Sequence, residues 1–129
     1  MIILTTDEVI GLHKKLIQAT GGSHGIRDMR LLESSVMSCT QTFGSEELYP
    51  TVIEKASRLA FSVCKNHPFI DGNKRVAVTV LLVVLRMNGV TLSFTQQELI
   101  TLGLGIADGS IDYDNIIEWV RDHIQKYDE

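Results

Sequence analysis

Residues Asn73–Asn88 read NKRVAVTVLLVVLRMN and are apolar at nearly every position from Val76 to Leu85. A segment that is apolar on all sides is typical of a helix buried at the centre of a small helical protein. The β-branched valines also suit a strand, but a single strand of that length among helical neighbours is the less favoured interpretation. We therefore expect a central helix that stops at Asn88-Gly89.

Helix signals precede this segment along the chain. Thr5 and Glu8 form a capping-box pattern at the start of a helix that Gly21-Gly22 ends. Asp28 suits the N-cap of a second helix, and Pro50 suits the first turn of a third. The third helix should end near Asn66, because the residue before Pro68 is pushed out of the helical region. Between the second and third helices we expect a polar loop over Thr40–Glu47.

Helix signals also follow the central segment. Val90–Phe94 suits a short extended piece, and Thr95 with Glu98 repeats the capping-box pattern. The glycines of Gly103-x-Gly105 and Gly109 favour a loop between helices. A last helix is expected from about Tyr113 to Tyr127, with five residues facing inward: Ile116, Ile117, Trp119, Val120 and Ile124. The predicted fold class is all-α, a compact bundle of about six helices around the central apolar one.

Composition limits the classes of function. The chain has 129 residues, 44% of them hydrophobic and 22% charged, which indicates a single soluble domain over residues 1–129. The net charge of −4 argues against direct nucleic-acid binding. The longest apolar run is too short to span a bilayer, so we expect no membrane association. With two cysteines there is no disulfide framework, and we expect a cytoplasmic protein.

The chemistry is concentrated in His67–Arg75, HPFIDGNKR, which ends at the start of the central helix. A helix N-terminus presents unpaired N–H groups that suit a phosphate, and Lys74 and Arg75 add positive charge there. Asp71 offers oxygen ligands for Mg²⁺, and His67 has the right pKa range to accept a proton from a hydroxyl. Together these side chains indicate transfer of a nucleotide phosphate group to a hydroxyl.

A purely structural interpretation explains these residues one at a time. Asp, Gly and Asn are common in turns, and basic residues on an exposed helix start are commonly solvated. Lys74 and Arg75 are nevertheless electrostatically unfavourable at a helix N-terminus. An anionic ligand explains that placement, whereas a structural role does not.

The stretch resembles the signature of the Fic/Doc family, H-x-F-x-(D/E)-(G/A)-N-x-R, at every defined position. Further likenesses to Doc-type proteins are found in Gly21–Ser34 and in the turn Ile106–Gly109, so that the resemblance covers nearly the whole chain. It implies an all-helical Fic/Doc-like core and transfer of part of a nucleotide, with ATP and Mg²⁺ as co-substrate and metal.

The resemblance also implies roles for single residues. His67 would be the base on the target hydroxyl, Asp71 would hold Mg²⁺, and Phe69 would be a buried anchor of the loop. The phosphates would be bound by four residues, Gly72, Asn73, Lys74 and Arg75. A flap that pins a target peptide as an added strand would comprise Gly21, Gly22, Ser23, His24, Gly25, Ile26 and Arg27.

Departures from the pattern bear on the reaction. Adenylylating members of the family usually read G-N-G-R-x-x-R, whereas here Lys74 replaces the second glycine and Val78 the second arginine. Both changes resemble the Doc branch, which is associated with phosphorylation of translation elongation factor Tu. Gly72 and Pro68 are closer to the general Fic pattern. A Doc-like kinase is therefore favoured, with a Fic-type adenylyltransferase and a non-catalytic antitoxin-binding module as alternatives.

The chain lacks the inhibitory S/T-x-x-x-E-(G/N) motif that holds many Fic proteins inactive. The nearest string, Thr42–Glu46, is followed by Glu47. The resemblance therefore implies inhibition by a second chain, a small antitoxin of the Phd type.

Overall fold

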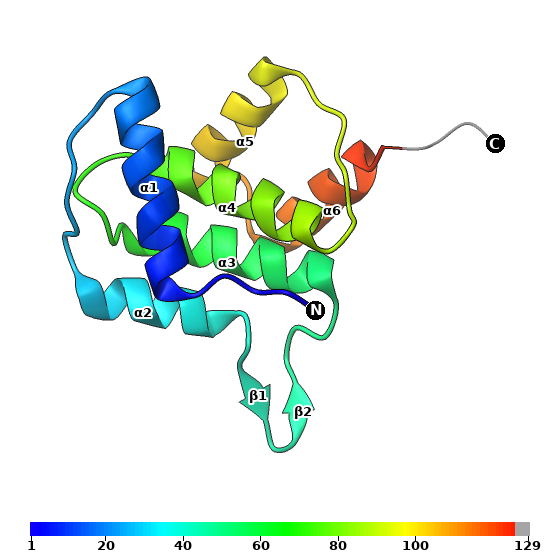
Figure 1. Ribbon diagram of the computed structural model, residues 1–129. Helices are drawn as coiled ribbons and strands as arrows, with labels where there is room; N and C mark the ends of the chain where they lie inside the picture. Colours follow the sequence, from blue (N-terminus) through cyan, green and yellow to red (C-terminus); the bar gives the residue numbers. More distant parts are fainter. Residues whose placement is uncertain (126–129) are drawn as a thin grey trace.

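Two helices, α3 (Val52–Asn66) and α4 (Asn73–Met87), lie side by side at the centre of the computed structural model, which describes residues 1–125 (Figure 1). Helix α4 buries Val76, Val80, Leu81 and Val84 completely. The central apolar segment is thus a helix, as predicted, because its neighbours cover it on several sides with apolar side chains.

The other helices pack around this pair. Helix α1 (Thr6–Thr20) packs on α4, and α2 (Met29–Ser38) packs on α3. On the far side, α5 (Gln96–Asp108) covers α4 and α6 (Tyr113–His123) covers α3 (Figure 1). Within the described residues there are six helices, and the prediction of an all-α bundle is confirmed. No helix among residues 1–125 is both long and apolar enough to cross a membrane.

The helix starts follow the capping signals with one exception. The capping boxes of Thr5 with Glu8 and of Thr95 with Glu98 are both formed, as predicted. The prediction that Pro50 lies in the first turn of α3 is wrong. The hydroxyl of Thr51 accepts a hydrogen bond from the Glu54 N–H, so Thr51 is the N-cap and Pro50 precedes the helix.

The segment predicted as a polar loop, Thr40–Glu47, contains a small hairpin of β1 (Thr42–Phe43) and β2 (Glu46–Glu47). The hairpin projects from the bundle (Figure 1). Glu47 anchors it, because its carboxylate lies 3.1 Å from the ammonium of Lys55, which is 4% exposed. This contact spans eight positions of the chain, and no strand or turn pattern in the sequence predicts it.

The expected loop at Gly103 and Gly105 is also wrong, because both glycines lie inside α5. A Cβ at Gly103 would make ordinary contact with Val78 of α4, at 3.5 Å, whereas a Cβ at Gly105 would clash with the Ile111 side chain. Gly109 ends the helix with a φ of 88°, in the left-handed region that favours glycine. Glycine favours loops by its low helix propensity, but that propensity is a weak preference that tertiary packing outweighs here.

The last helix is shorter than predicted. Helix α6 ends at His123, and Ile124 pairs with Leu92 as an extended bridge instead of facing inward. Ile124 is 36% exposed, so its assignment to the core was wrong, whereas Ile116 and Val120 are fully buried. The bridge confirms the extended piece expected over Val90–Phe94. Tyr127, the expected end of the helix, lies outside the described residues.

Candidate functional site

His67 begins the loop that joins α3 to α4. It is the C-cap of α3 and has a φ of 47° and a ψ of 56°, the left-handed conformation. Among the described residues it is the sole non-glycine with a positive φ. That conformation costs about 1 kcal/mol or more and is maintained only where surrounding contacts impose it. The side chain of His67 is exposed, so its imidazole is accessible to a substrate.

Phe69 and Asn73 hold the loop in shape. Phe69 is 1% exposed and anchors the loop in the core. The Asn73 side chain accepts a hydrogen bond from the Phe69 N–H and donates one to the Phe69 carbonyl, both at 3.0 Å. In this structure the amide of Asn73 is therefore engaged with the loop, and its role in phosphate binding stays a prediction.

Asp71 lies between the flap and the start of α4. Its Oδ2 accepts a hydrogen bond from the Ser23 N–H at 3.0 Å, and its Oδ1 accepts one from the Gly72 N–H at 2.8 Å. These two N–H groups, with the Arg75 guanidinium 3.6 Å away, lower the pKa of the Asp71 carboxyl. Asp71 is therefore ionised at neutral pH, and its side chain is 46% exposed.

Arg75 connects the start of α4 to the end of α1. Its Nη1 donates hydrogen bonds to the Thr20 hydroxyl and to the Gly21 carbonyl, each at 2.7 Å. Gly22 packs directly against this arrangement with a φ of 114°. A Cβ at Gly22 would lie 2.6 Å from the Asp71 carboxylate and 2.9 Å from the guanidinium of Arg75, so only glycine fits there.

The first turn of α4 has free donor capacity. Its N-cap is Gly72, with a φ of 77° and no side-chain capping bond. The first N–H groups of the helix therefore lack the partner that a Ser, Thr or Asp cap would supply. Lys74 and Arg75 stand on the same turn, so this end of α4 combines N–H donors with two positive charges. That combination suits an anion such as a phosphate. Contacts with Thr20, Gly21 and Asp71 give Arg75 a structural role that the sequence did not indicate, and its role in phosphate binding stays a prediction.

A cavity of about 290 Å³ opens beside these charges, between α1, α4 and α5. Its walls are mainly apolar. They are formed by Leu16, Thr20, Lys74, Arg75, Val78, Thr79, Gln96, Leu99, Ile100, Gly103 and Leu104. The cavity thus places an apolar surface next to the predicted phosphate-binding residues. Val78, which stands at the position of the second arginine in the adenylylating pattern, forms part of its wall.

His13, to which the sequence pattern gives no role, contacts the motif loop. His13 is 3% exposed, its ring stacks on Phe69 at a centroid distance of 3.8 Å, and its Nε2 lies 2.7 Å from the Asp71 carbonyl oxygen. His13 thereby ties α1 to the loop. In the sequence, His13 lies on the apolar face of α1 between Val9 and Ile17. That position predicts a buried side chain, but it does not predict a contact with the motif loop.

The flap Gly21–Arg27 lies against the same loop. The Arg27 and Asp28 N–H groups both donate to the Pro68 carbonyl, and the Ile70 N–H donates to the Gly25 carbonyl. Ile26 and Phe69 form the resulting antiparallel bridge. The structure therefore brings the flap and the motif together (Figure 1), while capture of a target peptide by the flap stays a prediction.

Comparisons with known proteins show the family of the chain. A family model described as the Fic/DOC family matches residues 3–85. The chain is similar to Toxin Doc of Mycolicibacterium smegmatis (strain ATCC 700084 / mc(2)155), at 37% identity over 75 residues, and the match spans 58% of each of the two chains. It is also similar to Protein kinase doc of Escherichia phage P1, at 30% identity over 118 residues, or 92% of each chain.

The chain therefore belongs to the Fic/DOC family. Both relatives carry the name Doc, so the predicted resemblance to Doc-type toxins is confirmed. The matched region includes α1, the flap, the motif loop and most of α4, the elements that build the site.

Proposed function

We propose that this protein is a Doc-like toxin that transfers the γ-phosphoryl group of ATP to a Ser or Thr hydroxyl of a protein target. The observation that carries the proposal is an exposed His67 in the same short loop as an ionised Asp71 and a cationic helix start. A proton acceptor, a carboxylate and a phosphate-binding helix end are the groups that phosphoryl transfer needs. The relative in phage P1 carries the name of a protein kinase.

In the proposed reaction the target oxygen attacks the γ-phosphorus and the bond from that phosphorus to the β,γ-bridging oxygen breaks. ADP leaves with the electron pair of that bond, and the hydroxyl proton goes to the imidazole of His67. The N–H groups of the first turn of α4, with Lys74 and Arg75, stabilise the charge on the phosphate oxygens. Asn73 and Phe69 hold the loop so that His67 stays exposed at its edge.

Asp71 is the residue that would hold Mg²⁺. Its carboxylate is ionised and half exposed, which fits the preference of this ion for one or two carboxylates and substrate phosphates. The bound ion would neutralise charge on the phosphates. The Ser23 N–H that donates to Asp71 lies in the flap, so the flap contacts the residue that would hold Mg²⁺.

The target proposed is translation elongation factor Tu, on the resemblance to the Doc branch. We further propose that a separate antitoxin of the Phd type inhibits the protein. The M. smegmatis relative carries the name Toxin Doc, which supports a toxin and antitoxin pair. The cavity between α1, α4 and α5 offers an antitoxin segment an apolar surface beside Lys74 and Arg75, and Ile100 and Leu104 on its wall are 45% and 50% exposed. We propose that the protein acts in the cytoplasm, where elongation factor Tu is found.

Adenylyl transfer is the second candidate, because His67 and Asp71 serve either reaction. It would require the α-phosphorus to face the target, with pyrophosphate leaving. Val78 and Lys74 disfavour it, because Val78 is an apolar, 8% exposed side chain where adenylylating relatives carry a second arginine. A phosphate chain extending in that direction would meet the apolar cavity wall instead of a guanidinium.

The test uses ATP labelled at the γ- or the α-phosphate, incubated with the purified protein, Mg²⁺ and elongation factor Tu. The proposal predicts label transfer from γ-labelled ATP alone. Label from α-labelled ATP would establish adenylyl transfer instead.

The variants compared are His67→Ala, which should abolish transfer, and Arg30→Ala, an exposed residue of α2 outside the motif and the flap, which should leave it unchanged. If neither label reaches elongation factor Tu, the same assay in bacterial lysate decides between another target and a non-catalytic antitoxin-binding module. Full activity of His67→Ala would refute the role of His67.

A further inference from the structure

The side chain of Arg27 contacts the backbone that carries His67. Its Nε donates to the His67 carbonyl at 2.6 Å, and its Nη2 donates to the Asn66 carbonyl at 2.8 Å. Arg27 belongs to the flap, which is expected to contact a target through its backbone. Its guanidinium is instead directed at the C-terminus of α3.

The two carbonyls that Arg27 contacts belong to the end of a helix. The last carbonyls of an α-helix lack intrahelical partners and carry the negative end of the helix dipole. A guanidinium satisfies both at once, because its planar fork holds two donors in fixed geometry, which a lysine ammonium does not. Arg27 therefore supplies the side-chain cap that α3 requires at its C-terminus.

Arg27 also explains how His67 keeps an unfavourable conformation. His67 has a φ of 47°, where most non-glycine residues are strained. On either side of it the chain is fixed, since Arg27 contacts Asn66 and the Arg27 N–H donates to Pro68 at 2.7 Å. Arg27 thus donates hydrogen bonds to the carbonyls of three consecutive residues, Asn66, His67 and Pro68.

We propose that Arg27 is a positioning residue that acts through the backbone to set the orientation of the His67 imidazole. The kinetic part of this inference rests on the proposed function, whereas the conformational part does not. A misplacement of about 1 Å in a reacting group costs on the order of 100-fold in rate. Loss of the fork should therefore lower kcat with little change in the KM for nucleotide.

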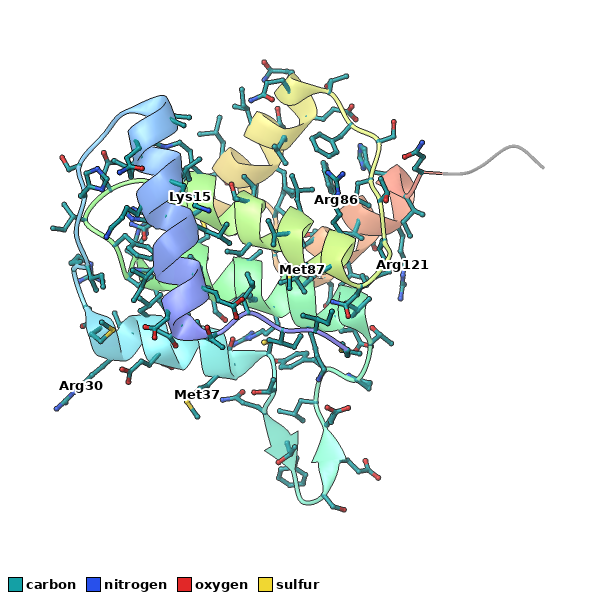
Figure 2. The ribbon with its side chains drawn as sticks, viewed as in Figure 1. Lys15, Arg30, Met37, Arg86, Met87 and Arg121 are labelled. Carbon is teal, nitrogen blue, oxygen red and sulfur yellow. The ribbon has the colours of Figure 1, made fainter. Side chains whose placement is uncertain are left out.

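The conformational test is NMR of the full chain. The ¹³Cα and ¹³Cβ shifts of His67 report its backbone conformation, so Arg27→Ala should lose the left-handed signature that the wild type shows. Arg27→Lys should show an intermediate shift, because one ammonium reaches one carbonyl but cannot form the fork. The control is Arg30→Ala, since Arg30 extends away from the bundle into solvent (Figure 2).

The kinetic test measures phosphoryl transfer with the same variants. Arg27→Ala should lower kcat by about 10- to 100-fold with nucleotide KM within about twofold. Arg27→Lys should recover part of the loss, and Arg30→Ala should match the wild type. A raised KM for the target protein with unchanged His67 shifts would overturn the proposal and make Arg27 a target-binding residue.

The two readouts separate the possible failures. Unchanged His67 shifts in Arg27→Ala would overturn the positioning role whatever the activity. Altered shifts in a protein whose wild type transfers no phosphate would uphold the conformational role of Arg27 and refute the proposed function instead.

Discussion

Replacing Asn73 by alanine removes the two hydrogen bonds that fold the motif loop onto the start of α4. Each bond to Phe69 is 3.0 Å long. Because Phe69 is buried, the N–H and carbonyl left behind have little access to water, and the two lost bonds cost about 3 kcal/mol together. Alanine recovers about 0.5 kcal/mol through its higher helix propensity at the first position of α4. The net expected loss is about 2 to 3 kcal/mol.

The loss is measured by urea denaturation of the wild type and of Asn73→Ala, followed by circular dichroism. For a chain of this size it corresponds to a fall in Tm of about 10 °C. The matched control is Gln97→Ala, an exposed amide in the first turn of α5 that bonds one threonine, for which we expect less than about 0.5 kcal/mol. An equally small change in Asn73→Ala would refute the reasoning and leave Asn73 free for phosphate binding.

Three more predictions concern His67, Lys55 and His123. His67→Gly should be as stable as the wild type or up to about 1 kcal/mol more stable, because glycine accepts the positive φ without strain, and it should transfer no phosphate. A clear loss of stability in thermal unfolding would show that the backbone of His67 is not strained. Glu47→Ala should lower the free energy of unfolding by about 1 to 2 kcal/mol in denaturant, because it leaves the buried Lys55 ammonium without its carboxylate. Lys55→Met should lower it less, and the reverse order would be inconsistent with this interpretation. The ring nitrogens of His123 lie 2.7 Å from the Trp119 carbonyl and 2.6 Å from Glu98, so both can donate only when the ring is protonated. Burial alone would lower the pKa of His123, but Glu98 and the carbonyl outweigh it and raise the pKa, while His123 and the Thr95 N–H lower the pKa of Glu98. Because the pKa of His123 is raised above its ordinary value of 6.5, its contribution to the free energy of unfolding is complete below pH 6.5 and is lost as the pH rises through the raised pKa. Because the pKa of Glu98 is lowered below its ordinary value of 4.5, its contribution is lost as the pH falls below 4.5. The stability difference between wild type and His123→Phe should therefore be larger at pH 5.5 than at pH 8.5, and a difference independent of pH would rule out the ion pair.

Local rules were sufficient for most of the fold. The apolar run of α4, the capping boxes at Thr5 and Thr95 and the stop before Pro68 are all short-range signals, and each was interpreted correctly. The errors occurred where a packing or side-chain contact outweighs the usual preference of a residue type. Gly103 and Gly105 lie inside α5 although glycine commonly interrupts helices, and Thr51 rather than Pro50 starts α3. The hairpin is held by Lys55, eight positions from Glu47.

The site was predictable as a set of residues but not as a network of contacts. The motif pattern and the helix start pointed to His67, Asp71 and the cations at the start of α4. Nothing in the spacing indicated that His13 contacts Asp71, or that the side chain of Arg27 contacts His67. The first contact joins residues 58 positions apart and the second joins residues 40 positions apart. Both form because α1 and the flap pack on the motif loop.

Phosphoryl transfer through His67 is measurable as the intact mass of elongation factor Tu after incubation with the protein, ATP and Mg²⁺. The wild type should raise that mass by about 80 Da, and His67→Gly should leave it unchanged. A gain of about 329 Da, the mass of an adenylyl group, would contradict the assigned reaction. A gain of about 80 Da that persists in His67→Gly would contradict the assigned base.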